Sequence, residues 1–179
     1  HILDDSNAKI LLVDRELFEV ASESLSACSA SPKVVVIEDE FADSRPEVSE
    51  NIIKYESLVS DGDPLFEWHR PYDEWQPLSL NYTSGTTGRP KGVVYHHRGS
   101  YLMSTGSITA WNMPNRLTYL YTVPMFHCNG WCFPWTVTAL AGTHICLRRT
   151  EPGPIYQSII DHQVTHMCGA PIVMGMLVN

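Results

Sequence analysis

Basic residues are scarce in this chain of 179 residues. Its 12 lysines and arginines stand against 20 aspartates and glutamates, which gives a formal net charge of -8 at pH 7. A general nucleic-acid binder needs a basic face to neutralise phosphates, so this charge balance excludes that class. It does not exclude a nucleotide, because one loop and one lysine can hold a phosphate chain locally. We therefore expect small-molecule partners and no nucleic acid.

Paired cysteines are also missing. The five cysteines are odd in number and contain no CxxC pair, which argues against a disulfide framework and favours a reducing compartment. The histidines lack metal-ligand spacing as well. His127, Cys128 and Cys132 lie close in sequence but match no zinc pattern. We therefore expect no metal site formed by these residues.

Long apolar runs are the third absence. No run approaches the ~20 apolar residues that a membrane-spanning helix needs, so no transmembrane segment is expected. Hydrophobic residues nevertheless make up 44% of the chain, and charged residues only 18%. This composition excludes wholesale disorder and is sufficient for a globular core.

Short apolar runs alternate with helical patterns along the whole chain. The segments KILLV at 9–13 and KVVVI at 33–37 indicate buried parallel strands on either side of an amphipathic helix. Further strands are expected at 78–82, 118–123, 143–147 and 165–168. Helices are expected at 52–59, 96–110, 130–141 (bent near Pro134), 154–162 and 172–179. This alternation predicts an α/β fold with a largely parallel sheet flanked by helices.

Four aromatic side chains gather in the proline-containing stretch before the strand at 78–82: Phe66, Trp68, Tyr72 and Trp75. They could form an aromatic patch for a ligand. Packing under a long connection is the favoured interpretation, because apolar side chains beneath long loops commonly form satellite clusters.

The segment YTSGTTGRPKG at 82–92 carries the clearest chemistry. Its glycines allow sharp turns and close approach of the backbone to a ligand, and successive N–H groups in such a loop can form an anion nest. Lys91 adds a positive charge. Four side chains add hydroxyl donors: Thr83, Ser84, Thr86 and Thr87. Since a polyphosphate needs many donors, one cation and no bulk, we predict a phosphate-binding loop.

This loop differs from a Walker A motif. That motif places glycine immediately before its lysine and Ser or Thr immediately after, whereas Lys91 is flanked by Pro90 and Gly92. An ordinary P-loop kinase or GTPase is therefore disfavoured. We expect the loop to follow a strand and precede a helix, a context in which a helix N-terminus contributes to anion binding.

Taken together, YTSGTTGRPKGVV closely resembles the signature of the acyl-adenylate-forming (AMP-binding) superfamily. That superfamily includes acyl-CoA synthetases, 4-coumarate–CoA ligases, luciferases and peptide-synthetase adenylation domains. The segment VPMFH at 123–127 resembles its next block, and CNGW at 128–131 is similar to the version in plant acyl-activating enzymes of the benzoate- and butyrate–CoA ligase type. ILDDSNAKILLVD at the start and VTHMCGAPIVMGMLVN at the end also resemble that branch.

The resemblance implies that residues 1–179 are a partial AMP-binding domain, part of the large N-terminal domain of an ATP-dependent carboxylic acid–CoA ligase. Its C-terminal portion and lid domain would lie outside this sequence. Such an enzyme converts an acid into acyl-AMP and transfers the acyl group to CoA. ATP, Mg²⁺ and CoA are therefore implied, with the magnesium ligands mostly outside this chain. The piece alone is expected to be inactive.

The resemblance also implies roles for individual residues. Lys91 and His127 would be catalytic: Lys91 would offset charge as pyrophosphate leaves, and His127 would order the carboxylate. The ATP phosphates would contact Thr83, Ser84, Gly85, Thr86, Thr87, Gly88 and Lys91. The acyl pocket would include His127, Trp131, Gly169 and Ala170, for which structural roles are the alternative. Arg149 is the candidate for the CoA path, with an ordinary exposed arginine as the alternative.

Two other functions remain open at this stage. One is an adenylation domain that loads a carrier protein, although CNGW favours the ligase branch. The other is a truncated, non-catalytic paralogue that binds only a nucleotide or a partner. The expected location is the cytoplasm or the peroxisome.

Overall fold

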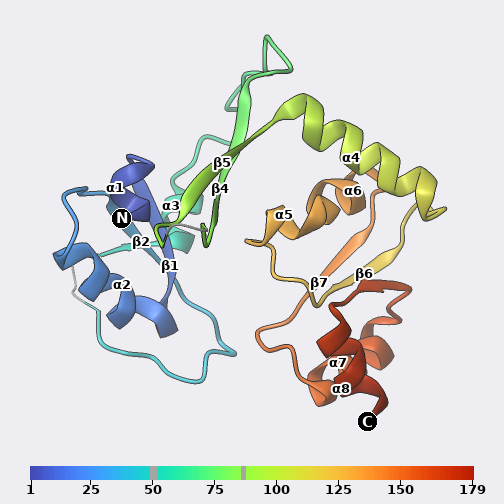
Figure 1. The fold of residues 1–179 in the computed structure, drawn as a ribbon. Coiled ribbons are helices and arrows are strands. Elements are labelled where there is room, and N and C mark those ends of the chain that lie inside the picture. The colour runs from blue at the N-terminus through green and yellow to red at the C-terminus, as the bar shows by residue number, and fades with distance from the viewer. Residues whose placement is uncertain (49–51, 86–87) are drawn as a thin grey trace. The chain divides into compact units, whose positions relative to one another are not determined.

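The structure is a computed structural model that describes residues 1–48, 52–85 and 88–179 (Figure 1). The chain divides into two compact units, His1–Arg70 and Pro71–Asn179.

The first unit contains a parallel sheet in the order β1-β2-β3. Ile10 pairs with Lys33 and Asp14 with Ile37 along the first two strands, which confirms the predicted strand–helix–strand series. The third strand is short, and the helix predicted at 52–59 begins only after it. In chain order the elements are α1 (Ile2–Asp5), β1 (Ile10–Asp14), η1 (Arg15–Leu17), α2 (Phe18–Ser26), β2 (Lys33–Ile37), β3 (Ile53–Lys54) and α3 (Tyr55–Ser60).

Burial in this sheet is less complete than the sequence predicts. Val35 and Val36 of the central strand are each 1% exposed, whereas Ile10 and Leu12 of β1 are 54% and 52% exposed. Val13, the next residue on β1, is buried. Successive strand side chains point to opposite faces, so one face of β1 is covered within the unit and the other is not. The prediction of a fully buried strand at 9–13 is therefore wrong for half of its side chains.

The second unit begins with an antiparallel hairpin of β4 (Pro77–Thr83) and β5 (Lys91–His96), followed by α4 (His97–Ala110). The predicted strand–loop–helix context of the phosphate loop is therefore wrong, since the loop joins two strands. The β-branched and aromatic residues Val93, Val94 and Tyr95 favour an extended chain after the loop. The helix begins only at His97, where the His96 ring nitrogen accepts a hydrogen bond from Gly99 N at 3.0 Å.

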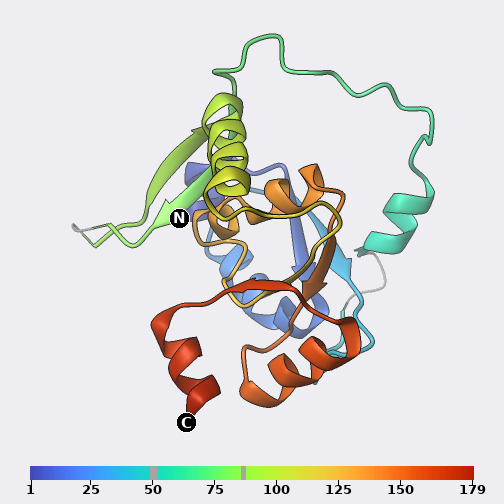
Figure 2. The same ribbon diagram turned by 90° about the vertical axis from the view of Figure 1, so that its right-hand side faces the viewer.

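A parallel sheet in the order β7-β6-β8 forms the rest of this unit. Figures 1 and 2 show α4 and α6 on one side of it and α7 and α8 on the other. The strands are β6 (Thr118–Tyr121), β7 (Thr143–Cys146) and β8 (His166–Cys168); the remaining helices are α5 (Cys128–Trp131), α6 (Phe133–Ala139), α7 (Pro152–His162) and α8 (Pro171–Val178).

Successive side chains of β6 point to opposite faces of this sheet and belong to two different hydrophobic cores. Tyr119 packs with Phe133 and Val137 on the α6 side. Leu120 packs with Ile155 and Val173 on the side of α7 and α8. A sheet covered on both faces by helices confirms the predicted α/β class, with the β4–β5 hairpin as its antiparallel exception.

The aromatic stretch before β4 does not pack as predicted. Phe66 and Trp68 in the first unit are 68% and 72% exposed, and Tyr72 in the second is 91% exposed. Trp75 is also largely exposed, but its ring lies 4.7 Å from that of His96, and the Arg98 guanidinium lies 5.7 Å from its centre. Within the described parts of the chain, no helix is both long and apolar enough to cross a membrane.

Candidate active site

The end of the β4–β5 hairpin gathers the described residues of the predicted phosphate loop. Thr83 pairs directly with Lys91 across the two strands, and both side chains are exposed. Ser84, Gly85 and Gly88 follow Thr83 in the connecting loop. Thr86 and Thr87, the other two predicted hydroxyl donors, lie outside the described residues. The hairpin thus places a hydroxyl and an ammonium group side by side at the mouth of the loop.

Glycine is required at Gly85 for two separate reasons. Its φ of +60° lies in the left-handed region, and a Cβ added there would lie 2.4 Å from the carbonyl oxygen of Arg89. Gly88 also has a positive φ, of +90°. The backbone therefore turns back closely on itself without side-chain bulk. Backbone N–H groups, hydroxyls and one lysine form a donor set that fits a polyphosphate.

A second feature is a cavity of about 460 Å³ at the carboxyl ends of β6 and β8. We call it the strand-end cavity. Thr122, which follows β6, donates a hydrogen bond from its hydroxyl to the carbonyl oxygen of Cys168 at 2.6 Å and so joins the two strand ends. The chain leaves β6 toward α6 on one face of the sheet and leaves β8 toward α8 on the other. Ligands commonly bind at such a switch point in an α/β sheet.

The strand-end cavity brings together all four residues of the predicted acyl pocket: His127, Trp131, Gly169 and Ala170. They come from loops that begin at different strands, so their spacing in sequence gives no direct sign of this proximity. Gly169 leaves room at the wall, because an added Cβ would lie 2.6 Å from the Met174 methyl carbon and 3.4 Å from the Thr122 hydroxyl. Thr122 and Thr150 also line the cavity and were not predicted from the sequence.

The short segment α5 (Cys128–Trp131) is a left-handed turn, and it holds His127 and Trp131. Cys128, Asn129, Trp131 and Cys132 have φ values of 48°, 45°, 55° and 63°. Left-handed helical geometry costs non-glycine residues roughly 1–2 kcal/mol each, so the surrounding structure must impose it. The predicted bend near Pro134 is thus misplaced. The helix breaks at this turn, and Pro134 lies in the first turn of α6, where its missing N–H is harmless.

A hydrogen bond joins this turn to the hairpin. The Ser79 hydroxyl of β4 lies 2.7 Å from the side-chain oxygen of Asn129, which is 50 residues away in sequence. The turn is also closed by backbone bonds from Gly130 N to His127 O at 2.9 Å and from Cys132 N to Asn129 O at 3.1 Å. The hairpin with the phosphate loop and the turn with His127 are therefore linked directly.

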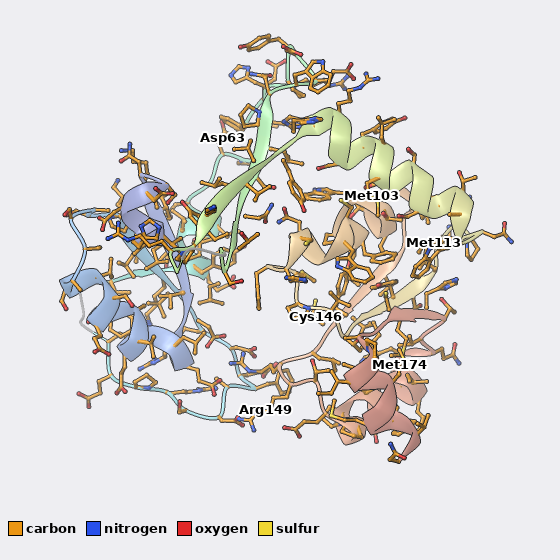
Figure 3. All side chains as sticks on the ribbon, viewed as in Figure 1. Asp63, Met103, Met113, Cys146, Arg149 and Met174 are labelled. Atoms are coloured by element: carbon orange, nitrogen blue, oxygen red, sulfur yellow. The ribbon has the colours of Figure 1, made fainter. Side chains whose placement is uncertain are left out.

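A second cavity, of about 450 Å³, lies between β5, α4 and the left-handed turn. We call it the helix cavity. It is lined by Val94, Tyr95, His96, Gly99, Ser100, Met103, Cys128, Trp131 and Cys132, and Figure 3 shows Met103 on α4. Trp131 lines both this cavity and the strand-end cavity. This cavity was not predicted from the sequence.

One buried polar group on the wall of the helix cavity has no partner within the described structure. Ser100 is 6% exposed, and its hydroxyl makes no hydrogen bond. An unsatisfied buried hydroxyl costs about 1–3 kcal/mol, so its retention needs a reason. Buried serines recur along α4 at Ser100, Ser104 and Ser107. That spacing of four and then three residues places them on one helix face, but only Ser100 of the three lines the helix cavity, so the spacing marks a buried helix face and not the cavity wall itself.

Two ionisable groups on this wall, Tyr95 and Cys132, have raised pKa values. Burial, and to a smaller extent a hydrogen bond with Cys128, raises the pKa of Tyr95 above its usual value. Burial, and to a smaller extent the nearby Cys128 side chain, raises the pKa of the Cys132 thiol. Both groups therefore stay protonated at neutral pH, and the helix cavity has no charge from either.

Arg149 lies apart from both cavity linings, in the loop between β7 and α7 (Figure 3). Its neighbour Thr150 lines the strand-end cavity, whereas the exposed Arg149 side chain does not. For a metal, no group of three or more His, Cys, Asp or Glu side chains comes together among the residues that the structure describes. A donor set for Mg²⁺ is therefore not assembled by the described residues alone.

Solved structures of adenylate-forming enzymes share this fold. The luciferase-like enzyme from the nonluminescent mealworm Zophobas morio matches all of this chain and 40% of its own, with a TM-score of 0.79 and 21% identity. The O-succinylbenzoate–CoA synthetase of Bacillus subtilis, solved with ATP and magnesium, matches 99% of this chain and 32% of its own, with a TM-score of 0.73 and 21% identity. At these identities the likeness concerns the fold alone.

Curated relatives are closer in sequence. The peroxisomal acetate/butyrate–CoA ligase AAE7 of Arabidopsis thaliana is 43% identical over 99% of this chain, and the 2-methylpropanoate–CoA ligase CCL4 of Humulus lupulus is 44% identical over 99%. The chain spans only about a third of each relative's length, 33% in both cases. The sequence profile of AMP-binding enzymes matches residues 1–179. The chain therefore belongs to the AMP-binding enzyme family.

Proposed function

We propose that this chain is part of an ATP-dependent carboxylic acid–CoA ligase. The observation that carries the proposal is the hydrogen bond between Ser79 and Asn129, because it joins the phosphate-loop hairpin to the turn that positions His127. A reaction between ATP and an acid requires these two binding regions to be held together. Two relatives, an acetate/butyrate–CoA ligase and a 2-methylpropanoate–CoA ligase, support an aliphatic acid as substrate.

In the proposed first step, a carboxylate oxygen attacks the α-phosphorus of ATP. The bond from that phosphorus to the bridging oxygen breaks, and pyrophosphate leaves as acyl-AMP forms. Thr83, Ser84 and the loop backbone would bind the phosphates, while Lys91 would offset the charge on the departing pyrophosphate. Groups positioned in advance for developing charge supply much of the acceleration in reactions of this kind.

In the proposed second step, the CoA sulfur attacks the acyl carbonyl carbon and loses its thiol proton to water, while the bond from that carbon to the AMP phosphate oxygen breaks. The products are the thioester and AMP. His127 would orient the carboxylate in the first step from the wall of the strand-end cavity. Arg149 remains the candidate for the CoA path, supported by its exposure beside Thr150, which lines that cavity.

We propose the cytoplasm or the peroxisome as the location of the protein, and two relatives named as peroxisomal support the peroxisome.

Acid-dependent ATP–pyrophosphate exchange in the full-length parent protein, followed by detection of the CoA thioester, tests this function. We expect both activities with short aliphatic acids. Exchange without any thioester would favour an adenylation domain that loads a carrier protein. ATP binding without exchange, across the series of acids, would favour a non-catalytic paralogue.

The substitution Gly85→Ala tests the loop itself. We expect it to weaken ATP binding by the full-length protein by about tenfold or more, because the new Cβ would meet Arg89 O at 2.4 Å and alanine disfavours the φ of +60°. Isothermal titration with ATP measures the effect. Gly106→Ala is the matched control, since its Cβ meets nothing within 4 Å and alanine suits the interior of α4. Equal ATP affinity in the two variants would show that the backbone at Gly85 plays no part in ATP binding.

A further inference from the structure

The helix cavity is not used by any step proposed above, and a buried hydroxyl without a hydrogen-bond partner in the described structure belongs to one of its lining residues, Ser100. We propose that it binds the far end of the acid, and that Ser100 selects acids that carry a hydroxyl or oxo group there. This inference rests on the proposed function, because it extends the acyl site from the strand-end cavity into the helix cavity.

Trp131 is the reason to connect the two cavities. Its side chain lines both, whereas His127 lines only the strand-end cavity. An acid with its carboxylate beside His127 would therefore run along the Trp131 indole and place its far end in the helix cavity. The helix cavity alone, at about 450 Å³, falls within the range of small-molecule sites.

The lining sets the chemistry of that far end. Val94, Met103 and Trp131 supply apolar surface for a hydrocarbon chain. Among the described residues, no lysine, arginine or carboxylate lines the helix cavity, and the Nδ1 atom of its one histidine, His96, already accepts a hydrogen bond from Gly99 N. The lining therefore offers little to compensate a charged terminal group. A neutral group that can hydrogen-bond is favoured.

Ser100 supplies the matching partner. It lines the cavity, it is 6% exposed, and its hydroxyl has no hydrogen-bond partner within the described structure. The hydroxyl oxygen is itself shielded in its present position, so contact with a ligand would require rotation about the Cα–Cβ bond to another staggered position. A hydroxyl can donate and accept, so either a terminal hydroxyl or an oxo group on the acid would satisfy it.

The test compares unbranched acids of about four to ten carbons, sizes suited to cavities of this volume, with their terminal-hydroxyl analogues. The full-length parent protein is used, and the readout is kcat/KM for acid-dependent pyrophosphate exchange. We expect the best hydroxy acid to exceed its unsubstituted counterpart by about tenfold or more, a scale set by pairing a buried hydroxyl. Ser100→Ala should abolish this preference, so that the hydroxy acid and its unsubstituted counterpart give kcat/KM values within about threefold of each other in that variant.

Ser107→Ala is the matched control, because Ser107 is a buried serine of the same helix that does not line the cavity. It should retain the preference. A thermal melt of each variant separates loss of folding from loss of selectivity. If no acid supports exchange, the proposed function fails. If unsubstituted acids are exchanged but no hydroxy acid is preferred, or if Ser100→Ala keeps the preference, this inference alone is overturned.

Discussion

Lys91→Ala in the full-length parent protein is expected to slow acid-dependent ATP–pyrophosphate exchange by about ten- to a thousand-fold, the scale of losing one preorganised charge contact. Lys91 begins β5 directly opposite Thr83, so its ammonium group stands at the mouth of the loop that would hold the phosphates. Removing it leaves the charge of the departing pyrophosphate uncompensated. Isotope exchange between labelled pyrophosphate and ATP measures the effect.

Lys33→Ala provides the comparison for Lys91→Ala. Lys33 is also exposed and also begins a strand, but it belongs to β2 of the first unit. Its removal changes the net charge equally, so exchange should stay within about twofold of the parent, as is usual for exposed residues away from special features. An unchanged rate of ATP–pyrophosphate exchange in Lys91→Ala would show that Lys91 has no role in acyl-adenylate formation.

His127→Ala is expected to lower acyl-adenylate formation by about a hundredfold while leaving ATP affinity within about threefold. The reason is geometric: His127 lines the strand-end cavity, whereas the phosphate-loop residues belong to the hairpin. Loss of an orienting contact displaces the carboxylate from its attack position, and small displacements carry large kinetic costs. Single-turnover formation of acyl-AMP and titration with ATP separate the two effects.

His162→Ala is the control for this prediction. His162 is an exposed histidine at the end of α7 and lines neither cavity. Its removal should leave both measurements unchanged. If His127→Ala instead weakened ATP binding and left adenylate formation intact, the role assigned to His127 would be wrong.

Local patterns were sufficient to predict most elements of this fold. The run KVVVI gave β2 with the predicted bounds, because β-branched residues pack well on a pleated surface. The alternation of strands and helices gave the α/β class. Two elements were predicted wrongly. The strand β5 was missed although its local residues favour an extended chain, and the left-handed turn at 128–132, which a hydrogen bond joins to distant Ser79, replaced the expected bend at Pro134.

The sequence by itself determined the donor chemistry of the phosphate loop and the family resemblance, because both depend on residues that are adjacent in the chain. Only the tertiary structure decided which separated residues share a wall. It placed His127 with Gly169 at the ends of two neighbouring strands, joined Asn129 to Ser79, and left the Ser100 hydroxyl buried without a partner on the described cavity wall. Parallel strands are joined by long crossovers, so residues that meet at strand ends lie far apart in sequence. Their contacts follow from packing of the whole sheet rather than from any local pattern.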